Sequence, residues 1–476
     1  MPAAARPAAD EVEALRREIQ ALRDQIRTLQ ARVETLTRAV PAPGPASTDD
    51  VEALRREVEA LRELARALEE KIASMTAAPS PPAPAEVPPP PPPPAAAPAP
   101  QPLTLFRTPS AYMSVSLDAL FDFGWSSTPD VSGLLNLGDH DPSARGATLP
   151  NTEAVFEGAV DPYFKGLADI VWKLDEEGET GVEMEESYIV TTGLPGHLSL
   201  KAGQWFTDFG RLNPRHPHQW DFVDQPLVLN RLFGPDGLRN PGVQVAWLAP
   251  TPFFLEASLN LLNGKGETAW SFRNSEGAEF HGRTGVDRLL KSLGDLVYVP
   301  RIATSFELRS SNTLVVGTTA ALGSNSAGDD TDTSIYGLDL YWKWRPERAM
   351  KGFPFFSLQA EGMKRSYETG EDAAAGLPAE TLRDDGFYAQ CLWGFRPRWV
   401  LGLRGEAVGG NRGAFPDEGV WRAGRTRLST NLTWYPSEFS KLRLQYNRDT
   451  GRFVGDENSL WFQMEFLLGS HGAHKF

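Results

Sequence analysis

Apolar and polar residues alternate along many short stretches of the chain after residue 103. Between positions 336 and 344, for example, Tyr336, Leu338 and Leu340 alternate with Gly337 and Asp339. Such alternation places successive side chains on opposite faces of a strand. Runs of about ten residues that end in aromatic residues are typical of strands in membrane β-barrels. The pattern predicts sixteen strands, near residues 111–125, 151–160, 163–175, 179–192, 197–208, 241–249, 252–262, 298–309, 312–323, 332–345, 352–367, 385–396, 399–409, 421–434, 439–449 and 458–468.

The predicted connections between these strands differ in length by parity. Those after even-numbered strands are short, as at residues 161–162 and 397–398. Outer-membrane barrels have short periplasmic turns and long external loops, whereas a soluble β-sandwich has no reason to sort its loops in this way. Residues 103–476 are therefore predicted to form an all-β membrane barrel of about sixteen antiparallel strands, with both ends in the periplasm. The long connections follow odd-numbered strands, at residues 126–150, 209–240, 263–297, 368–384 and 410–420.

A helical period covers residues 12–75. Apolar residues recur there at steps of three and four, which is the a/d pattern of a coiled coil. β-Branched residues at a with leucine at d favour a parallel dimer, porins usually assemble as trimers, and an antiparallel hairpin is a third arrangement. Residues 1–78 are thus predicted to be an α-helical coiled coil in two segments, with apolar positions Val12, Leu15, Ile19, Leu22, Ile26, Leu29, Val33 and Leu36, then Val51, Leu54, Val58, Leu61, Ala65, Leu68, Ile72 and Met75.

Residues 79–102 are almost entirely proline and alanine, with an unbroken proline run from Pro88 to Pro94. Such a run adopts the extended polyproline II helix and cannot form a core. It predicts a semi-rigid polyproline linker between the coiled coil and the barrel.

Composition narrows the class of protein further. The chain of 476 residues carries a formal net charge of −15, which argues against nucleic acid as a partner. It contains no run of 18 apolar residues, so no transmembrane helix is expected, and Cys391 is its single cysteine. No signal peptide is visible, and since a barrel requires export we expect that one has been removed. The predicted location is the bacterial outer membrane, with the coiled coil as a periplasmic stalk.

If the apolar residues of each strand face lipid, the alternate residues face the lumen, and their charges are segregated. Acidic residues gather on the first four strands and basic residues on strands thirteen to fifteen. Opposed walls of this kind would orient dipolar solutes and give selectivity; alternatively, the charges solvate the lumen or pair as salt bridges. The candidates are Asp118, Asp122, Glu157, Asp169, Glu183 and Glu185 on the acidic side, and Arg404, Arg425, Arg427, Lys441 and Arg443 on the basic side.

The connection at residues 209–240 is unusually long and rich in apolar residues. A loop of this composition is not expected to extend into solvent, so we predict that it folds into the barrel and narrows the pore. Its apolar residues Leu227, Leu229, Leu232 and Phe233 would then be buried. The charged residues that it would present to permeating solutes are Arg211, Arg215, Asp221, Asp224 and Arg231.

His216 and His218, together with Asp221 and Asp224, are weak candidates for a zinc site. A polar loop packed by proline and tryptophan is the alternative interpretation. No Ser-His-Asp set, phosphate-binding loop or isolated carboxylate pair stands out in the sequence as catalytic. We therefore expect neither an enzyme nor a cofactor, with an outer-membrane hydrolase as the alternative.

The stretch Thr207-Asp208-Phe209-Gly210-Arg211-Leu212-Asn213-Pro214, with His216-Pro217-His218 and residues 220–224 after it, resembles a poorly characterised family of proteobacterial outer-membrane, porin-like β-barrels. The last residues, 469–476, resemble that family too. The resemblance implies an outer-membrane location, and some members are labelled zinc-regulated TonB-dependent receptors. Such receptors have a plug domain and about 22 strands, neither of which this sequence predicts. Phe476 resembles the terminal aromatic residue that barrel-insertion machinery binds.

Two functions of different class fit these patterns. The first is a porin-like channel, predicted to be a homotrimer in outer-membrane lipid, for passive diffusion of small hydrophilic solutes. The second is a structural tether, in which the stalk contacts the cell wall or a periplasmic partner. A zinc-related uptake protein is a lesser alternative.

Overall fold

A computed structural model describes residues 9–38, 45–76, 103–108, 110–159, 161–174, 178–273, 279–416 and 419–469. The chain divides into two compact units, Met1–Ala97 and Pro98–Phe476. All of the predicted polyproline linker, residues 79–102, lies outside the described residues, and so does Phe476. The linker and the role of the terminal aromatic residue therefore stay predictions.

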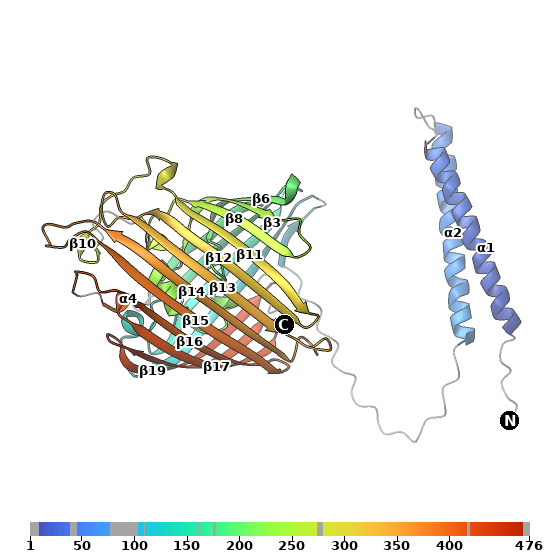
Figure 1. The fold of residues 1–476 in the computed structure, drawn as a ribbon. Coiled ribbons are helices and arrows are strands. Elements are labelled where there is room, and N and C mark those ends of the chain that lie inside the picture. The colour runs from blue at the N-terminus through green and yellow to red at the C-terminus, as the bar shows by residue number, and fades with distance from the viewer. Residues whose placement is uncertain are drawn as a thin grey trace, which may run out of the picture. The chain divides into compact units, whose positions relative to one another are not determined.

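The N-terminal unit consists of two helices, α1 (Ala9–Arg38) and α2 (Pro45–Thr76). They lie side by side and run in opposite directions (Figure 1), and Arg23 pairs with Glu69 across them at 2.8 Å. Ile19, Val58 and Ala65, all apolar positions of the predicted heptads, are buried between them. Within this single chain the helices thus form the antiparallel hairpin, while a coiled coil between chains stays a prediction. None of the described helices is both long enough and apolar enough to cross a membrane.

The second unit is a closed antiparallel barrel (Figure 1). Each strand of the barrel pairs with the next barrel strand along the chain, and pairing of the last with the first closes the ring. The sixteen predicted strands are confirmed, with boundary shifts of a few residues. They are β2 (Tyr112–Ser126), β3 (Gly146–Ala159), β4 (Phe164–Leu174), β5 (Thr180–Thr191), β6 (Leu198–Phe206), β7 (Arg239–Leu248), β8 (Phe254–Leu262), β11 (Val297–Arg309), β12 (Asn312–Ser324), β13 (Asp332–Trp344), β14 (Phe355–Thr369), β15 (Glu380–Arg396), β16 (Trp399–Gly410), β17 (Arg425–Ser437), β18 (Ser440–Gly451) and β19 (Gly455–Leu468).

Short elements outside the predicted pattern complete this unit. Strand β1 (Leu103–Arg107) pairs with the first residues of β2, and β9 (Glu279–Phe280) pairs with β10 (Arg283–Thr284) in a small hairpin. Two short helices lie in connections, α3 (Leu227–Phe233) between β6 and β7, and α4 (Gly419–Arg422) before β17.

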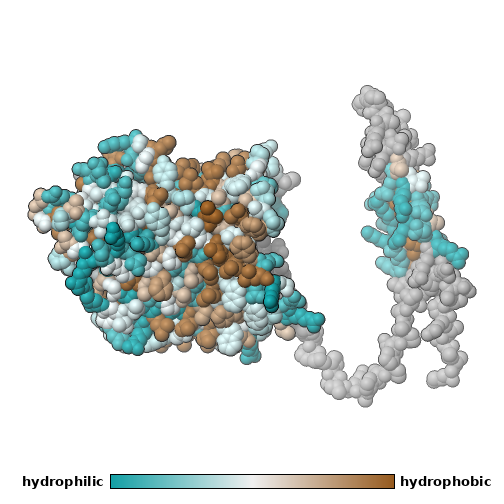
Figure 2. All heavy atoms as spheres, in the orientation of Figure 1, coloured by the Kyte–Doolittle hydropathy of each residue, from teal (hydrophilic) through white to brown (hydrophobic). Residues whose placement is uncertain are grey.

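Exposure alternates along the strands as the sequence predicts. On β18, Leu444 and Tyr446 are exposed, whereas the residues between and beside them, such as Arg443 and Gln445, are buried. Figure 2 shows hydrophobic side chains gathered over the strands on the face in view, with hydrophilic ones towards the end at the left. The outer surface of the strands is therefore apolar and the inner surface polar, as expected for a barrel in lipid.

The inner surface of β11–β14 departs from this rule. Val297, Val299, Ile335 and Met363 point inward and are buried in one apolar cluster. They pack against the connection between β6 and β7, which supplies the other side of the cluster. Apolar inward residues are stable here because a loop, and not water, covers them.

Candidate functional site: the loop across the barrel interior

The connection between β6 and β7 crosses the interior of the barrel. The backbone N–H of Val223 donates to Gln445 on β18 at 2.9 Å, and that of Leu227 donates to Glu406 on β16 at 2.7 Å. Strands β6 and β16 are eight places apart in the ring of sixteen, and so lie on opposite walls. Residues 207–238, called the crossing loop below, therefore reach from one wall to the other.

On the wall formed by β3–β5, called the near wall below, the crossing loop places histidines beside carboxylates. His216 Nδ1 lies 3.0 Å from Glu185 Oε2, and its Nε2 lies 3.0 Å from Glu186 Oε2. His218 Nδ1 lies 3.2 Å from Glu153 Oε2. Burial by itself lowers the pKa of His216, but the facing carboxylates, Glu153 foremost, outweigh burial and raise that pKa well above its usual value.

On the wall formed by β16–β18, called the far wall below, the crossing loop places a carboxylate beside arginines. Asp224 is buried and pairs with Arg404 at 2.6 Å and with Arg427. Gln445 and Asn447 donate to the same carboxylate at 2.7 and 3.0 Å. The loop thus places two histidines beside the acidic wall and a carboxylate beside the basic wall.

Carbonyl groups of the crossing loop satisfy further cations of the basic wall. Lys441 donates from Nζ to the carbonyl of His218 at 2.9 Å, and Arg443 donates to that of Trp220 at 2.9 Å. Since buried cations need partners, these bonds fix the path of the loop.

Arg231 of helix α3 joins a second buried group of charges. It pairs with Asp384 on β15 at 2.9 Å, and Asp384 also pairs with Arg365 at 2.7 Å and with Arg422 at 3.3 Å. One carboxylate therefore holds together three arginines from a loop helix, the barrel wall and α4. Arg231 is 3 % exposed, so it is a structural residue of this group.

An apolar cluster stabilises the same part of the crossing loop. Leu229, Leu232 and Phe233 of α3 are at most 1 % exposed. Phe233 packs edge-on against Phe209, with ring centroids 4.8 Å apart. These contacts bury the residues that the sequence analysis expected to be covered.

Arg211, Arg215 and Asp221 of the crossing loop remain partly exposed, as does Asp208 at its start. The guanidinium of Arg211 lies 4.1 Å from the ring centre of Tyr341 on β13, and Gln390 on β15 donates to Asp221 at 2.8 Å. The five charged loop residues predicted to face permeating solutes thus fall into two groups, because Asp224 and Arg231 are buried.

The turn at Gly210 allows the crossing loop to enter the barrel. Glu361 on β14 accepts the backbone N–H groups of Arg211 and Leu212, each at 3.0 Å. Gly210 has a φ of 64°, and a Cβ there would collide with the Glu361 carboxylate. Only glycine fits both the left-handed backbone and the space.

We expect Gly210→Ala to lower the free energy of unfolding by about 2 kcal/mol or more, from left-handed strain plus the collision. Gly376→Ala is the matched control, because Gly376 has a φ of 68° but open space around its Cα. Urea unfolding of the refolded variants, followed by tryptophan fluorescence, measures both. Equal losses in the two variants would contradict the role assigned to the Glu361 contact.

The connection between β2 and β3 supports the crossing loop from the side. Asp141 accepts the backbone N–H of Gln225 at 2.8 Å and that of Gly138 at 3.1 Å. Burial, followed by the neighbouring Asp224 carboxylate, raises the pKa of Asp141 to about 7. The two loops are therefore held together at the far wall.

The acidic candidates divide in the same way as the loop residues. Asp118, Asp122, Asp169 and Glu185 are buried, whereas Glu157 and Glu183 are partly exposed. Glu183 pairs with Lys173 at 3.2 Å and with Arg239. The basic candidates are all buried, namely Arg404, Arg425, Arg427, Lys441 and Arg443.

Several residues of the site were missed by the sequence analysis. Glu153 shares a strand face with Glu157, so the alternation alone could have identified it. Glu186 could not have been found in this way, because a bulge in β5 places two residues, Glu185 and Glu186, opposite Asp169. Asp384 and Glu361 are inward residues whose partners only the folded loop supplies.

The predicted zinc ligands are not brought together. His216 and His218 contact the near wall, whereas Asp224 contacts Arg404 and Arg427, and Asp221 accepts from Gln390. The two histidines and the two aspartates are therefore held by different strands of the barrel.

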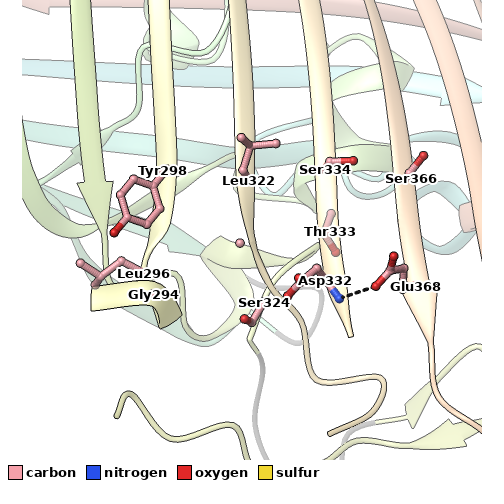
Figure 3. Close-up of a pocket in the computed structure, with 11 residues that line it drawn as sticks. Gly294, Leu296, Tyr298, Leu322, Ser324, Asp332, Thr333, Ser334, Ser366 and Glu368 are labelled. Atoms are coloured by element: carbon pink, nitrogen blue, oxygen red, sulfur yellow. Dashed lines mark hydrogen bonds between the residues drawn. The ribbon is translucent and has the colours of Figure 1, made fainter. Parts of the chain in front are cut away.

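A pocket of about 330 Å³ lies elsewhere, where β11–β14 end (Figure 3). Tyr298, Leu322, Ser334 and Ser366 line it. Ser334 has the same strand parity as the exposed Tyr336 and Leu338, so this pocket is on the outer surface of the barrel and is separate from the crossing loop.

The closed ring and the loop folded inside it define a porin-like β-barrel. Among solved structures, the chain is similar to the outer-membrane channel DcaP of Acinetobacter baumannii, with 12 % identity, a TM-score of 0.51, and coverage of 76 % of this chain and 99 % of that one. It is also similar to an anion-selective porin from Comamonas acidovorans, with 6 % identity, a TM-score of 0.47, and coverage of 75 % and 99 %. The sixteen-stranded ring does not support the label of TonB-dependent receptor.

The chain is 32 % identical, over 349 residues, to an uncharacterized protein of Aquifex aeolicus, covering 70 % of each chain. It belongs to the same family as that protein. No profile of a known protein family matches the chain.

Proposed function

We propose that the protein is an outer-membrane channel for passive diffusion of small hydrophilic solutes, and that the crossing loop bounds its passage. The observation that carries this proposal is the division of the loop charges. Asp224 and Arg231 are buried as anchors, whereas Arg211, Arg215 and Asp221 stay partly exposed inside the barrel. Charged groups that line a narrow aqueous passage set the relative permeability of ions.

Arg215→Ala is expected to shift the channel towards cations, because it removes a positive charge from the passage. We expect a change of about 2-fold or more in the cation-to-anion permeability ratio. The reversal potential of a planar bilayer in a salt gradient measures it. Arg448→Ala is the control, since Arg448 lies on the outward face of β18, with its side chain 56 % exposed. A reversal potential that moves in the control and stays fixed in Arg215→Ala would refute the assignment.

We further propose that the apolar outer surface contacts outer-membrane lipid, that the channel assembles as a homotrimer, and that Phe476 engages the insertion machinery. The mass of the refolded protein in detergent tests the trimer, and deletion of Phe476 tests insertion in cells. A monomeric mass, or unchanged insertion, would remove the corresponding part of the proposal.

A tether is the second candidate, and the separate helical unit favours it. In this proposal the helices and the linker form a periplasmic stalk that contacts the cell wall or a periplasmic partner. Deleting residues 1–102 would then alter the spacing of the cell envelope in electron micrographs and leave conductance unchanged. An unaltered envelope would count against the tether alone.

A further inference from the structure

Three carboxylates from three adjacent strands converge on one nitrogen of the crossing loop. His216 Nδ1 lies 3.0 Å from Glu185 Oε2, 3.3 Å from Asp169 Oδ2 and 3.7 Å from Glu153 Oε1. Glu153, Asp169 and Glu185 are 0 % exposed, and they come from β3, β4 and β5. Ligand atoms of Glu153, Asp169 and His216 all lie within 4.8 Å of one another.

A proton on His216 Nδ1 cannot satisfy all three carboxylates. An imidazole nitrogen carries at most one hydrogen, so Nδ1 can donate to only one of the three carboxylates. Among the described residues, neither oxygen of Asp169 has a hydrogen-bond partner, and neither does Glu153 Oε1. Nor do Glu153 and Asp169 form an ion pair with any described lysine or arginine. Their ion-pair partners are His216 and His218, and Glu153 Oε2 also accepts from Asn151 at 3.2 Å. Buried carboxylate oxygens without partners are costly.

The other nitrogen of His216 is oriented in the way that metal ligands require. Its Nε2 lies 3.0 Å from Glu186 Oε2. Histidines that bind metals usually donate their second ring N–H to a carboxylate, which leaves the first nitrogen free to coordinate. The three distances from His216 Nδ1 to carboxylate oxygens agree as well, because donor atoms about 2.0–2.1 Å from a tetrahedral ion are about 3.3 Å apart.

We propose that His216 Nδ1, Asp169 and Glu153 bind a divalent transition-metal ion, with Glu185 at the fourth position. An imidazole with carboxylate oxygens suits zinc and the neighbouring first-row ions. The ion would satisfy the unpartnered oxygens and would fasten the crossing loop to β3–β5, whereas its Asp224 anchor lies on β16–β18. This inference does not depend on whether the barrel conducts.

A second group of possible ligands, Asp139, His140 and Asp236, lies nearby but is already balanced. Lys173 pairs with Asp139, and Arg239 pairs with Asp236. With its carboxylates neutralised by cations, this group offers less to a metal ion than the set around His216.

The test is metal binding by the refolded full chain. His471 and His474 in the C-terminal tail are also potential ligands, so all measurements use a background with His471→Ala and His474→Ala. Zn²⁺ is titrated against a chromophoric chelator, and Co²⁺ absorption reports the coordination number. We expect about one equivalent of Zn²⁺ and the intense visible absorption of four-coordinate Co²⁺. Asp169→Asn should weaken Zn²⁺ binding by about 10-fold or more.

Asp122→Asn is the matched control, because Asp122 is an equally buried carboxylate on β2 that is not among the ligands. It should bind Zn²⁺ like the background protein. Glu153→Gln is the second variant if Asp169→Asn does not refold, and the Co²⁺ spectrum of the background protein needs neither. Absence of stoichiometric binding, a Co²⁺ spectrum without the four-coordinate signature, or equal Zn²⁺ affinity in the ligand variant and the control would each overturn the proposal. Protons alone would then occupy the cluster.

Discussion

Asp224→Ala is expected to lower the free energy of unfolding by about 3–5 kcal/mol, because it leaves two buried arginines without their shared partner. Arg404 and Arg427 are each at most 2 % exposed, and both pair with the Asp224 carboxylate. Glu406 and Asp449 remain as their other partners, at 2.9 Å in each case. The loop would lose its anchor on the far wall, while the barrel would keep its strand pairing.

Urea unfolding in lipid vesicles measures this loss, and protease cleavage within residues 207–238 reports release of the loop. Asp221→Ala is the matched control, since Asp221 is a carboxylate of the same loop that accepts from Gln390 and has no arginine partner within 4.0 Å among the described ion pairs. It should unfold close to the unmodified protein. If the two variants unfold alike, the far-wall anchor does not hold the loop.

Phe233→Ala is expected to lower the free energy of unfolding by about 3–5 kcal/mol, which is the usual range when a buried phenylalanine is truncated. Its ring is 1 % exposed and packs with Phe209, Leu229 and Leu232 inside the barrel. Because this cluster holds α3 against β14–β16, the same variant should also expose the loop to protease. The measurements are those used for Asp224→Ala.

Phe453→Ala is the matched control for Phe233→Ala, because it removes the same side chain from an exposed position. Phe453 lies between β18 and β19 and is 53 % exposed, so its truncation should change stability by less than about 0.5 kcal/mol. A small loss in Phe233→Ala, comparable to that of Phe453→Ala, would mean that the interior cluster contributes little.

The strands could be predicted because lipid and lumen impose a period of two. That period locates β12 and β13 almost to the residue, and it places Arg443 and Asp118 on the inner face. Strand β1 escaped prediction, since its five residues, Leu-Thr-Leu-Phe-Arg, are too few to establish a period. The bulge at Glu185 and Glu186 was not predicted for another reason. An inserted residue breaks the alternation, and no residue pattern in the sequence indicates where this happens.

The site itself was predicted only in outline. The apolar residues of α3 indicated that the loop would fold inward, and the segregated charges indicated two different walls. The sequence could not show that the loop would bring histidines to one wall and Asp224 to the other. Asp224 and Arg404 are 180 residues apart in the sequence. Their contact depends on the path of the loop through the closed ring.

Replacement of the crossing loop tests most directly the proposal that this loop narrows a channel. Phe206 and Arg239 are partners across β6 and β7, so an Asn-Gly turn can replace residues 207–238. Single-channel recording in planar bilayers compares the full chain with this variant, after both are shown to refold by heat-dependent gel mobility. We expect discrete conductance from the full chain and about 2-fold or greater conductance from the variant. A folded full chain without any conductance, or equal conductance in the two proteins, would contradict the account.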